Sequence, residues 1–323
     1  MWCWGKNNQF EVGRPKQIAN CMAGAACNPT PEKVDVPAAT GLALGDQHAF
    51  VLTASDVYGM GAGDAGQFGD NSGDRMTPAV LGALAGAQQV IGGNAHSCWL
   101  VGGQVRCAGE NNDGELGNGS TSASTTPVVA IQAGIDAIGG GFQHACAIGG
   151  GVIRCWGENG GDQVDENGGD VTTPRTIANL TTATQVTGGE GHTCALLADG
   201  ALRCWGANNA GQLGDGMTGD PPGPVTPQIT GVAQIVAGTD HTCARRTDGG
   251  VWCWGENLGT SPVQITLPRP AVHIAAGSYH DCFALDDGSV WCRGWNAYGQ
   301  RGLGTLGDRT MDPPTQVLLC PAP

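Results

Sequence analysis

The chain is built from one unit of about 48 residues that recurs from end to end. The clearest copy, residues 188–216, reads GGEGHTCALLADGALRCWGANNAGQLGDG. The histidines of successive units lie 48, 48, 48, 49 and 39 residues apart, at His48, His96, His144, His192, His241 and His280. A fixed period of roughly 20 to 50 residues is the signature of solenoids, propellers and related arrays, in which each unit packs on its neighbours. The repeat therefore restricts the chain to such an architecture.

Each unit contains four short apolar runs separated by turn residues, which is a pattern of β-strands. In the clearest copy and its flanks the runs are Ala183–Thr187, Thr193–Leu197, Ala201–Trp205 and Val225–Ile229. Asp-Gly pairs such as Asp199-Gly200 supply hairpin turns between the second and third runs, since Gly tolerates positive φ. Four strands in about 48 residues, without a helical period, predict an all-β propeller of four-stranded blades.

The chain is predicted to be a single propeller domain spanning 1–323, with six complete blades and an incomplete seventh. The units are expected at 1–41 (partial), 42–87, 88–134, 135–182, 183–232, 233–271 and 272–323. Residues 1–20 supply only the third and fourth strands of their blade. Because MWCWG at 1–5 matches the middle of a later unit, we expect an export signal and half a repeat upstream.

The unit HTCALLADGALRCWGANNAGQLGDG resembles the regulator of chromosome condensation (RCC) repeat, and more closely its cysteine-rich bacterial version. The resemblance extends over nearly the whole chain; it is strongest at 188–216 and 243–255 and weakest at 157–168. It implies a seven-bladed β-propeller that binds other proteins. The nucleotide-exchange role of the family's chromatin-bound founder does not suit an acidic, cysteine-rich chain without a basic arm.

Ten of the fourteen cysteines bracket hairpin turns. They are nine or ten residues apart in five pairs: Cys98–Cys107, Cys146–Cys155, Cys194–Cys204, Cys243–Cys253 and Cys282–Cys292. Residues that face each other on antiparallel strands have Cα atoms about 4.5–5.5 Å apart, a separation that a disulfide can span. The first unit has Phe50 opposite Gly59 instead, a packing substitute. Metal ligation by His-x-Cys and Cys is the alternative, but the spacing of structural zinc sites is absent.

The four other cysteines are assigned with less support from the pattern. Cys21 and Cys27 are expected to close their own inserted loop, and Cys3 and Cys320 to clasp the two ends of the chain, by elimination alone. Regular disulfides predict an oxidising compartment. We therefore expect an extracellular or cell-surface protein, with the periplasm as the alternative.

The other repeated residues are interpreted as scaffold. Each motif histidine is expected to satisfy backbone groups at an equivalent bend; a ring of imidazoles that binds a metal or an anion is the alternative. Tryptophans that follow a cysteine are expected between blades, and the others are candidates for stacking on carbohydrate: Trp2, Trp99, Trp252, Trp291 and Trp295. The Asn/Asp/Gly loops at 109–119 and 206–216 predict tight turns. Calcium is the alternative there, and no other cofactor is expected.

Charge and motifs exclude several functions. A net charge of −14 without a run of Lys or Arg repels phosphates, so no nucleic acid partner is expected. No apolar stretch reaches the ~18 residues of a membrane span. The sequence has no G-x-S-x-G, no phosphate-binding loop and no H-E-x-x-H motif. No catalytic residue is assigned, and the chain is predicted not to be an enzyme.

The resulting prediction is a non-catalytic extracellular recognition scaffold that binds another protein through its variable loops. Asn20–Val36, 158–172 and 215–226 depart most from the unit and are the candidate contact segments. A carbohydrate- or envelope-binding lectin-like protein is the alternative, and an enzyme comes third. An aromatic patch on one rim would favour a protein partner, whereas tryptophan-lined pockets in every blade would favour a sugar.

Overall fold

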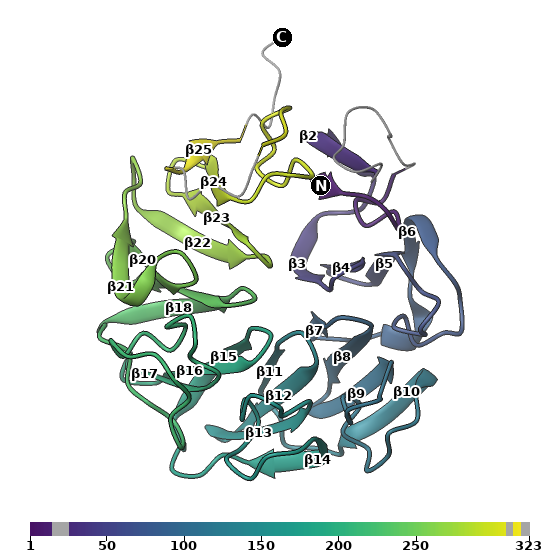
Figure 1. Ribbon diagram of the computed structural model, residues 1–323. Helices are drawn as coiled ribbons and strands as arrows, with labels where there is room; N and C mark the ends of the chain where they lie inside the picture. The colour runs from purple at the N-terminus through teal and green to yellow at the C-terminus, as the bar shows by residue number, and fades with distance from the viewer. Residues whose placement is uncertain (15–25, 308–312, 318–323) are drawn as a thin grey trace.

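The computed structural model describes residues 1–14, 26–307 and 313–317. Its sheets are arranged around a central axis as the blades of a β-propeller (Figure 1). A two-stranded half-blade, β1 (Trp2–Lys6) paired with β2 (Cys27–Lys33), lies between the last blade and the first. The predicted all-β propeller with six blades and an incomplete seventh is confirmed, and five of the six blades have four strands while the fourth has three and a single outer bridge.

Each blade corresponds to one sequence unit, and its strands follow one another outward from the axis. The first blade comprises β3 (Ala39–Leu44), β4 (His48–Thr53), β5 (Val57–Gly61) and β6 (Arg75–Val80). The second comprises β7 (Gln89–Gly92), β8 (His96–Val101), β9 (Gln104–Gly109) and β10 (Ser124–Ile131), and the third β11 (Ala137–Gly140), β12 (His144–Gly149), β13 (Val152–Gly157) and β14 (Val171–Thr176). The fourth comprises β15 (Ala183–Gly188), β16 (His192–Leu197) and β17 (Leu202–Gly206), and the fifth β18 (Val232–Ala237), β19 (His241–Arg246), β20 (Val251–Gly255) and β21 (Gly259–Ile265). The sixth comprises β22 (Ala271–Ala276), β23 (His280–Leu285), β24 (Val290–Gly294) and β25 (Thr315–Gln316).

The fourth blade differs from the prediction in its outer strand. A strand was expected at Val225–Ile229, but the chain there forms a single bridge, from Val225 to Cys204. Pro224 and Pro227 flank this bridge. Proline at the position of Pro224 also occurs inside the intact outer strands of other blades, as at Pro127 in β10. Pro227 is the additional proline of this blade, and because it has no N–H to donate to the sheet, the ladder does not extend beyond the bridge.

The hydrophobic core lies between neighbouring blades. In β4, β8, β12 and β16 five of the six residues are buried, because the second strand of a blade is covered by a sheet on each face. The largest fully buried side chains include Trp99, Trp156 and Trp254. The fold therefore depends on contacts between units rather than within them.

The antiparallel order gives the propeller two different faces. The turn between the first and second strands and the connection between the third and fourth open on one face, which we call the loop face. Two contacts between neighbouring units confirm this: Gln143 donates to Asp113, and Gln212 donates to Asp240. The candidate segments 158–172 and 215–226 therefore lie on the loop face. Asn20–Val36 spans β2, but its residues 20–25 lie outside the described residues.

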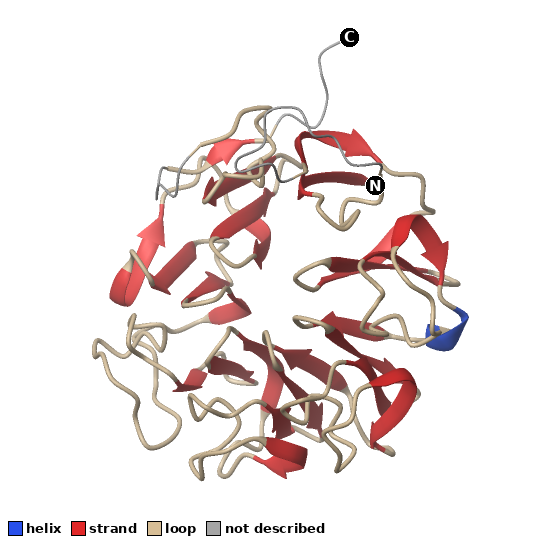
Figure 2. Cartoon of the chain, turned by 45° about the vertical axis from the view of Figure 1, so that its right-hand side comes forward, coloured by secondary structure: helices blue, strands red, loops and turns tan. Residues whose placement is uncertain are grey.

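Helix is almost absent from the part of the chain that is described. Among these residues the only helix is the short 3-10 turn η2 (Gly82–Leu84), at the outer edge of the ring in Figure 2. No helix there has the length and hydropathy of a transmembrane segment.

Candidate functional site

Five disulfides join the cysteine pairs of the hairpins at Cα–Cα distances of 4.1–4.2 Å. In each hairpin the two cysteines are paired in register, as Cys194 is with Cys204. In the first blade Phe50 is paired with Gly59. A Cβ at Gly59 would lie 2.8 Å from Leu81 Cδ1 and 2.9 Å from the ring of Phe68, so Leu81 and Phe68 together fill the space above the glycine. The prediction named Phe50 and missed Phe68, which comes from the connection between β5 and β6.

The predicted clasp between Cys3 and Cys320 is wrong at Cys3, which has a free thiol. On β1, Cys3 is paired with Glu32, and among the described residues no strand lies on the other side of β1. Burial raises the pKa of the Cys3 thiol to about 11. Cys320 and Cys21 lie outside the described residues, and Cys27 is disulfide-bonded.

Four of the six motif histidines, His48, His144, His192 and His241, hydrogen-bond a side chain of the next blade. The imidazole Nε2 of His144 is 2.9 Å from the hydroxyl of Thr193, and that of His192 is 2.9 Å from the hydroxyl of Thr242. Each hydroxyl donates to a carbonyl, Thr193 to Gln163 and Thr242 to Gln212, so it accepts from an Nε2–H. The partner is therefore a side chain of the next unit and not the local backbone that the sequence predicted.

These imidazoles are neutral scaffold groups. His48, His96, His144 and His192 are buried, and burial lowers the pKa of each to about 3 or 4. Each packs on a glycine three residues earlier: a Cβ at Gly189 would lie 2.4 Å from His192 Cε1. The glycine is therefore required where the imidazole folds back on its own turn.

The tryptophans that follow a cysteine are fixed by the loop of the preceding blade. Their indole N–H groups donate to backbone carbonyls in that loop: Trp156 to Glu115, Trp205 to Gln163, Trp254 to Gln212 and Trp4 to Gln300. A glycine two residues after the carbonyl lies against the indole in three of these contacts, at Gly117, Gly214 and Gly302. The Trp4 contact joins the half-blade to the sixth blade. The Gly304 N–H also donates to the Pro29 carbonyl, so an indole contact and a backbone contact join the two, and Cys3 is not disulfide-bonded.

Among the carbohydrate candidates, Trp99 is fully buried and cannot stack on a ligand. Trp2, Trp252, Trp291 and Trp295 are half-buried. They do not line an equivalent pocket in every blade.

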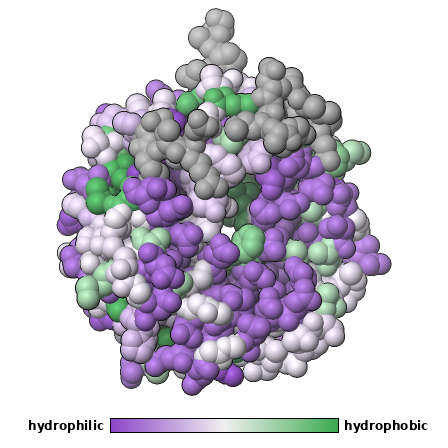
Figure 3. Space-filling view, in the orientation of Figure 1, coloured by the Kyte–Doolittle hydropathy of each residue, from purple (hydrophilic) through white to green (hydrophobic). Residues whose placement is uncertain are grey.

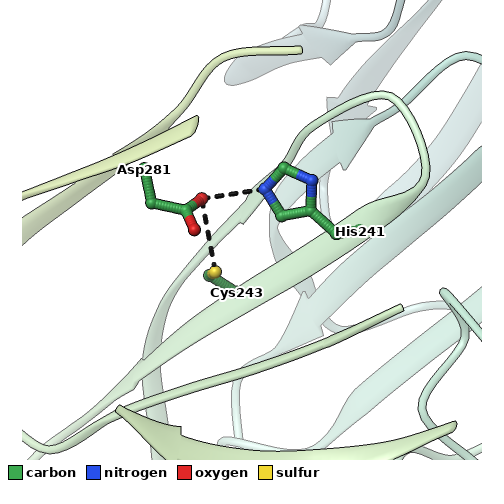
Figure 4. Close-up of side chains that lie close together, drawn as sticks. All are labelled: His241, Cys243 and Asp281. Atoms are coloured by element: carbon green, nitrogen blue, oxygen red, sulfur yellow. Dashed lines mark hydrogen bonds and ion pairs between the residues drawn. The ribbon is translucent and has the colours of Figure 1, made fainter. Parts of the chain in front are cut away.

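A buried charged cluster joins the fifth and sixth blades (Figure 4). Asp281 takes the position that Thr193 and Thr242 hold in other blades, 2.8 Å from His241 Nε2, and its second oxygen accepts from Arg293. Burial alone would raise the pKa of Asp281, but His241 and Arg293 outweigh burial and hold that pKa well below its usual range.

This cluster does not fit a metal centre. His241, Cys243 and Asp281 have potential ligand atoms within 4.8 Å of one another. However, Cys243 is bonded to Cys253, so its sulfur is not a thiolate and has no proton to donate. The 3.5 Å approach of this sulfur to Asp281 is a packing contact. Arg293 already neutralises the carboxylate, so the cluster acts as a joint between blades.

The loops between the third and fourth strands are organised by a buried asparagine that the sequence analysis missed. Asn208 accepts from the Leu213 N–H and donates to the Met217 carbonyl. The same arrangement occurs at Asn111, Asn159 and Asn296. An asparagine two residues after the glycine that ends the third strand, present in these four units and absent from the first, where Gly63 follows Gly61, is the signal that could have identified it. These bonds support the prediction of tight turns.

The loop face is strongly acidic over four consecutive blades. Residues 109–123, 157–170, 206–224 and 255–258 contain no Lys or Arg. Their acidic residues are Glu110, Asp113, Glu115, Glu158, Asp162, Asp165, Glu166, Asp170, Asp215, Asp220 and Glu256. Burial and the charge of Asp170 raise the pKa of Asp113, and burial, Glu190 and Glu256 raise that of Asp240. The surface around the central opening in Figure 3 is mainly hydrophilic.

Three aromatic side chains gather on the loop face of the sixth blade. Trp295 lies edge-on to Tyr279, with ring centroids 5.6 Å apart, and edge-on to Tyr298, at 5.4 Å. All three are half-buried. Tyr279 comes from the turn before β23, and Trp295 and Tyr298 follow β24, so the fold unites residues from two segments. Of the three, only Trp295 was a candidate from the sequence.

Comparison with known proteins identifies the repeat and the fold. The regulator of chromosome condensation (RCC1) repeat matches residues 183–212, 232–258 and 271–300. Human WBSCR16 has a similar structure, with 21% identity and a TM-score of 0.84 over 98% of this chain and 93% of that chain. Prp20p from Saccharomyces cerevisiae, described with its binding to Gsp1p and histones, has 21% identity and a TM-score of 0.84 over 98% of this chain and 85% of that chain.

Yeast RCC1 (Prp20), in a structure with Kap60 bound, gives 21% identity and a TM-score of 0.83, over 98% of this chain and 83% of that chain. No curated protein matches the sequence. The repeat match and these structural likenesses agree with the geometry of the blades. The chain is a β-propeller with five hairpin disulfides, and three of its units match the RCC1 repeat.

Proposed function

We propose that this propeller is a non-catalytic scaffold that binds a protein partner with a basic surface through its loop face. The observation that carries the proposal is the run of acidic loops over four blades without a Lys or Arg. Such a surface attracts cationic partners and speeds their association. Prp20p binds proteins according to its description, which supports the use of the same fold for protein recognition.

The aromatic cluster favours a protein partner over a carbohydrate. Tyr279, Trp295 and Tyr298 form one half-buried group in one blade and have no counterpart repeated around the ring. Aromatic residues are enriched at the centres of protein interfaces, where they supply much of the binding energy. The acidic loops would then attract the partner, and the aromatic group would anchor it.

An extracellular location is part of the same proposal. Five buried disulfides form and persist in oxidising compartments, and they suit a secreted or cell-surface scaffold. Fixed loops also reduce the conformational entropy that is lost on binding.

Selection of peptides from a random displayed library tests the proposal. We expect selected peptides to be rich in Lys and Arg and to lose affinity as the salt concentration rises. Glu190→Lys, an exposed change on the loop face, should weaken their binding severalfold. Asp35→Lys makes the same charge change at an exposed site between β2 and β3, on the opposite face, and should leave binding unchanged.

Equal binding by both variants, or selected peptides without basic residues, would refute recognition by the acidic loops. A glycan array that gives salt-independent binding, unaffected by Glu190→Lys, would instead support the carbohydrate alternative.

A further inference from the structure

The loop of the third blade contains the pentapeptide ENGGD twice, at residues 158–162 and 166–170. Each copy places an asparagine directly before a glycine, at Asn159 and at Asn167, and the only other such pair in the chain is Asn118–Gly119 in the loop of the second blade. Asparagine is a chemically labile residue. A glycine after it has no Cβ to hinder attack on the side-chain amide by the next backbone nitrogen. The three pairs are therefore intrinsically reactive, and the fold decides which of them reacts.

Asn159 is fully buried, and both ends of its amide are hydrogen-bonded. Its Oδ1 accepts from the Val164 N–H at 2.8 Å, and its Nδ2 donates to the Gly169 carbonyl at 3.3 Å. The N–H of Gly160, which is the group that would attack, donates to the Glu158 carboxylate at 2.7 Å. The amide carbon and the attacking nitrogen of this pair cannot meet until these bonds break.

Asn118 is exposed, but the glycine that follows it is held by the neighbouring blade. The Gly119 N–H donates to the Thr172 carbonyl at 2.8 Å, and the Asn118 Oδ1 accepts from the Ser120 N–H at 3.1 Å. Attack by this nitrogen requires the loss of a backbone hydrogen bond between two blades, which slows the reaction without preventing it.

Asn167 has neither form of protection. Asn167, Gly168 and Gly169 are all exposed, and within the part of the chain that the structure describes the Gly168 N–H makes no hydrogen bond. The Asn167 N–H donates to Asp165 at 3.1 Å, and its side chain contacts the same carboxylate at the surface, where water competes for it. A Cβ at Gly168 would meet no atom within 4 Å, so the loop has room to bring the nitrogen to the amide.

We propose that Asn167 is a site of spontaneous deamidation, whereas the fold protects Asn159 in the identical pentapeptide. The Gly168 nitrogen attacks Cγ of Asn167 and forms the new N–C bond of a five-membered succinimide ring. The bond from Cγ to Nδ2 breaks, and Nδ2 leaves as ammonia with the proton that Gly168 has lost. Water then adds to one of the two ring carbonyls and opens the ring. The product is an aspartate, or an isoaspartate whose main chain runs through the side-chain carbon, and water is the only other reactant.

Deamidation adds a negative charge to a loop that is already acidic. The new carboxylate lies in the same segment as Asp165, Glu166 and Asp170, and Arg175 is already paired with Asp165 at 2.6 Å. The loop face therefore becomes more acidic as the protein ages. An effect on recognition rests on the proposed function, because a more negative surface attracts a basic partner more strongly.

The test follows the folded, disulfide-bonded chain during incubation at physiological temperature and neutral pH. Peptide mapping by mass spectrometry detects the gain of about one dalton at each asparagine. We expect Asn167 to convert first, Asn118 to convert several times more slowly, and Asn159 to stay intact. In the reduced chain unfolded in urea, Asn159 and Asn167 should convert at equal rates, because their flanking residues are the same.

Two glycine variants identify the attacking group. Gly168→Ala should slow the conversion of Asn167 severalfold, because the new methyl group hinders the attacking nitrogen. Gly169→Ala is the matched control: φ is +62° at Gly168 and +74° at Gly169, and a Cβ at either would meet no atom within 4 Å. The two changes thus strain the loop equally, but only the first alters the attacking residue. Asn167→Asp supplies the product, and it should bind the selected basic peptides more tightly than the unmodified chain.

Conversion of Asn118 or Asn159 before Asn167 in the folded chain would overturn the proposal, as would equal rates in Gly168→Ala and Gly169→Ala. A difference between Asn159 and Asn167 that persists in the unfolded chain would overturn it too, because the fold would then not be the source of the protection. Equal peptide binding by Asn167→Asp and the unmodified chain would refute only the effect on recognition. A failure of basic peptides to bind at all would refute the proposed function and leave the mass measurement unaffected.

Discussion

The indole N–H of Trp4 donates a hydrogen bond of 2.7 Å to the carbonyl of Gln300, across 296 positions of sequence. Trp156, Trp205 and Trp254 make the same contact with a loop only 41 or 42 positions earlier. The half-blade and the sixth blade are therefore joined by the same contact that joins successive units.

Replacement of Trp4 by phenylalanine should lower the free energy of unfolding by about 1–2 kcal/mol. The change keeps an aromatic ring but leaves the Gln300 carbonyl without its donor. Urea unfolding measures the effect. Trp252→Phe, at another half-buried indole, is the control and should lower the free energy of unfolding by less. Equal losses in the two variants would contradict a specific role for the Trp4–Gln300 hydrogen bond.

Gly189→Ala should destabilise the fold by about 1–3 kcal/mol, since the new methyl group would lie 2.4 Å from both His192 Cε1 and the Gly238 carbonyl. Gly73→Ala is the matched control, because a Cβ there meets no atom within 4 Å. Thermal unfolding of the two variants should separate them by several degrees. If Gly189→Ala is as stable as Gly73→Ala, the imidazole does not pack on this glycine.

The buried histidines should make the fold sensitive to mild acid. Burial lowers the pKa of His144 to about 3, whereas an imidazole in an unfolded chain titrates near ~6.5. Between these values the unfolded chain binds protons that the folded chain does not, so the free energy of unfolding falls as the pH drops below ~6.5.

Urea titrations from neutral to acid pH measure this slope. His144→Gln should reduce the slope of the unfolding free energy with pH by about the contribution of one titrating group. His273→Gln, at an exposed site on β22, should leave the slope unchanged. A flat profile above pH ~5 would show that the imidazoles are not buried as neutral groups.

Asp281→Asn should cost about 3–5 kcal/mol near neutral pH, since Arg293 would be left buried without a counter-charge. The folded pKa of Asp281 lies below its unfolded value near ~3.9, so its contribution is present above that value and is lost as the pH falls below it. The difference between the original chain and the variant should therefore shrink in acid. Asp35→Asn, at an exposed carboxylate, supplies the control; a difference that stays constant with pH would contradict the ionised pair.

The strands and the five hairpin disulfides could be predicted because they follow from local spacing. A turn of fixed length sets the register of a hairpin, and Cys194 must then face Cys204. The bond from Cys3 to Cys320 was predicted only because these cysteines were left over after the others had been paired. No spacing or register supported that prediction, and it was wrong at Cys3.

Contacts between units were harder to predict from the sequence. The partner of His192 is Thr242 in the next blade, and neither residue identifies the other by its spacing within a unit. The aromatic group of Tyr279 and Trp295 was missed for the same reason, because the two lie on separate segments that only the folded blade brings together.

The histidine and the loop carbonyl of one unit both act on the blade that follows, as His144 does on Thr193 and Gln163 does on Trp205. Each unit therefore supplies the histidine and the loop carbonyl to its contact with the following unit, and the hydroxyl and the indole to its contact with the preceding unit. A unit copied by tandem duplication can therefore contact both of its new neighbours through the same residues. The ring can gain a blade in this way without a new kind of interface. A blade exchanged singly with an unrelated propeller would bring two mismatched junctions, whereas one exchanged between units that share the histidine–threonine and tryptophan–carbonyl contacts would bring none.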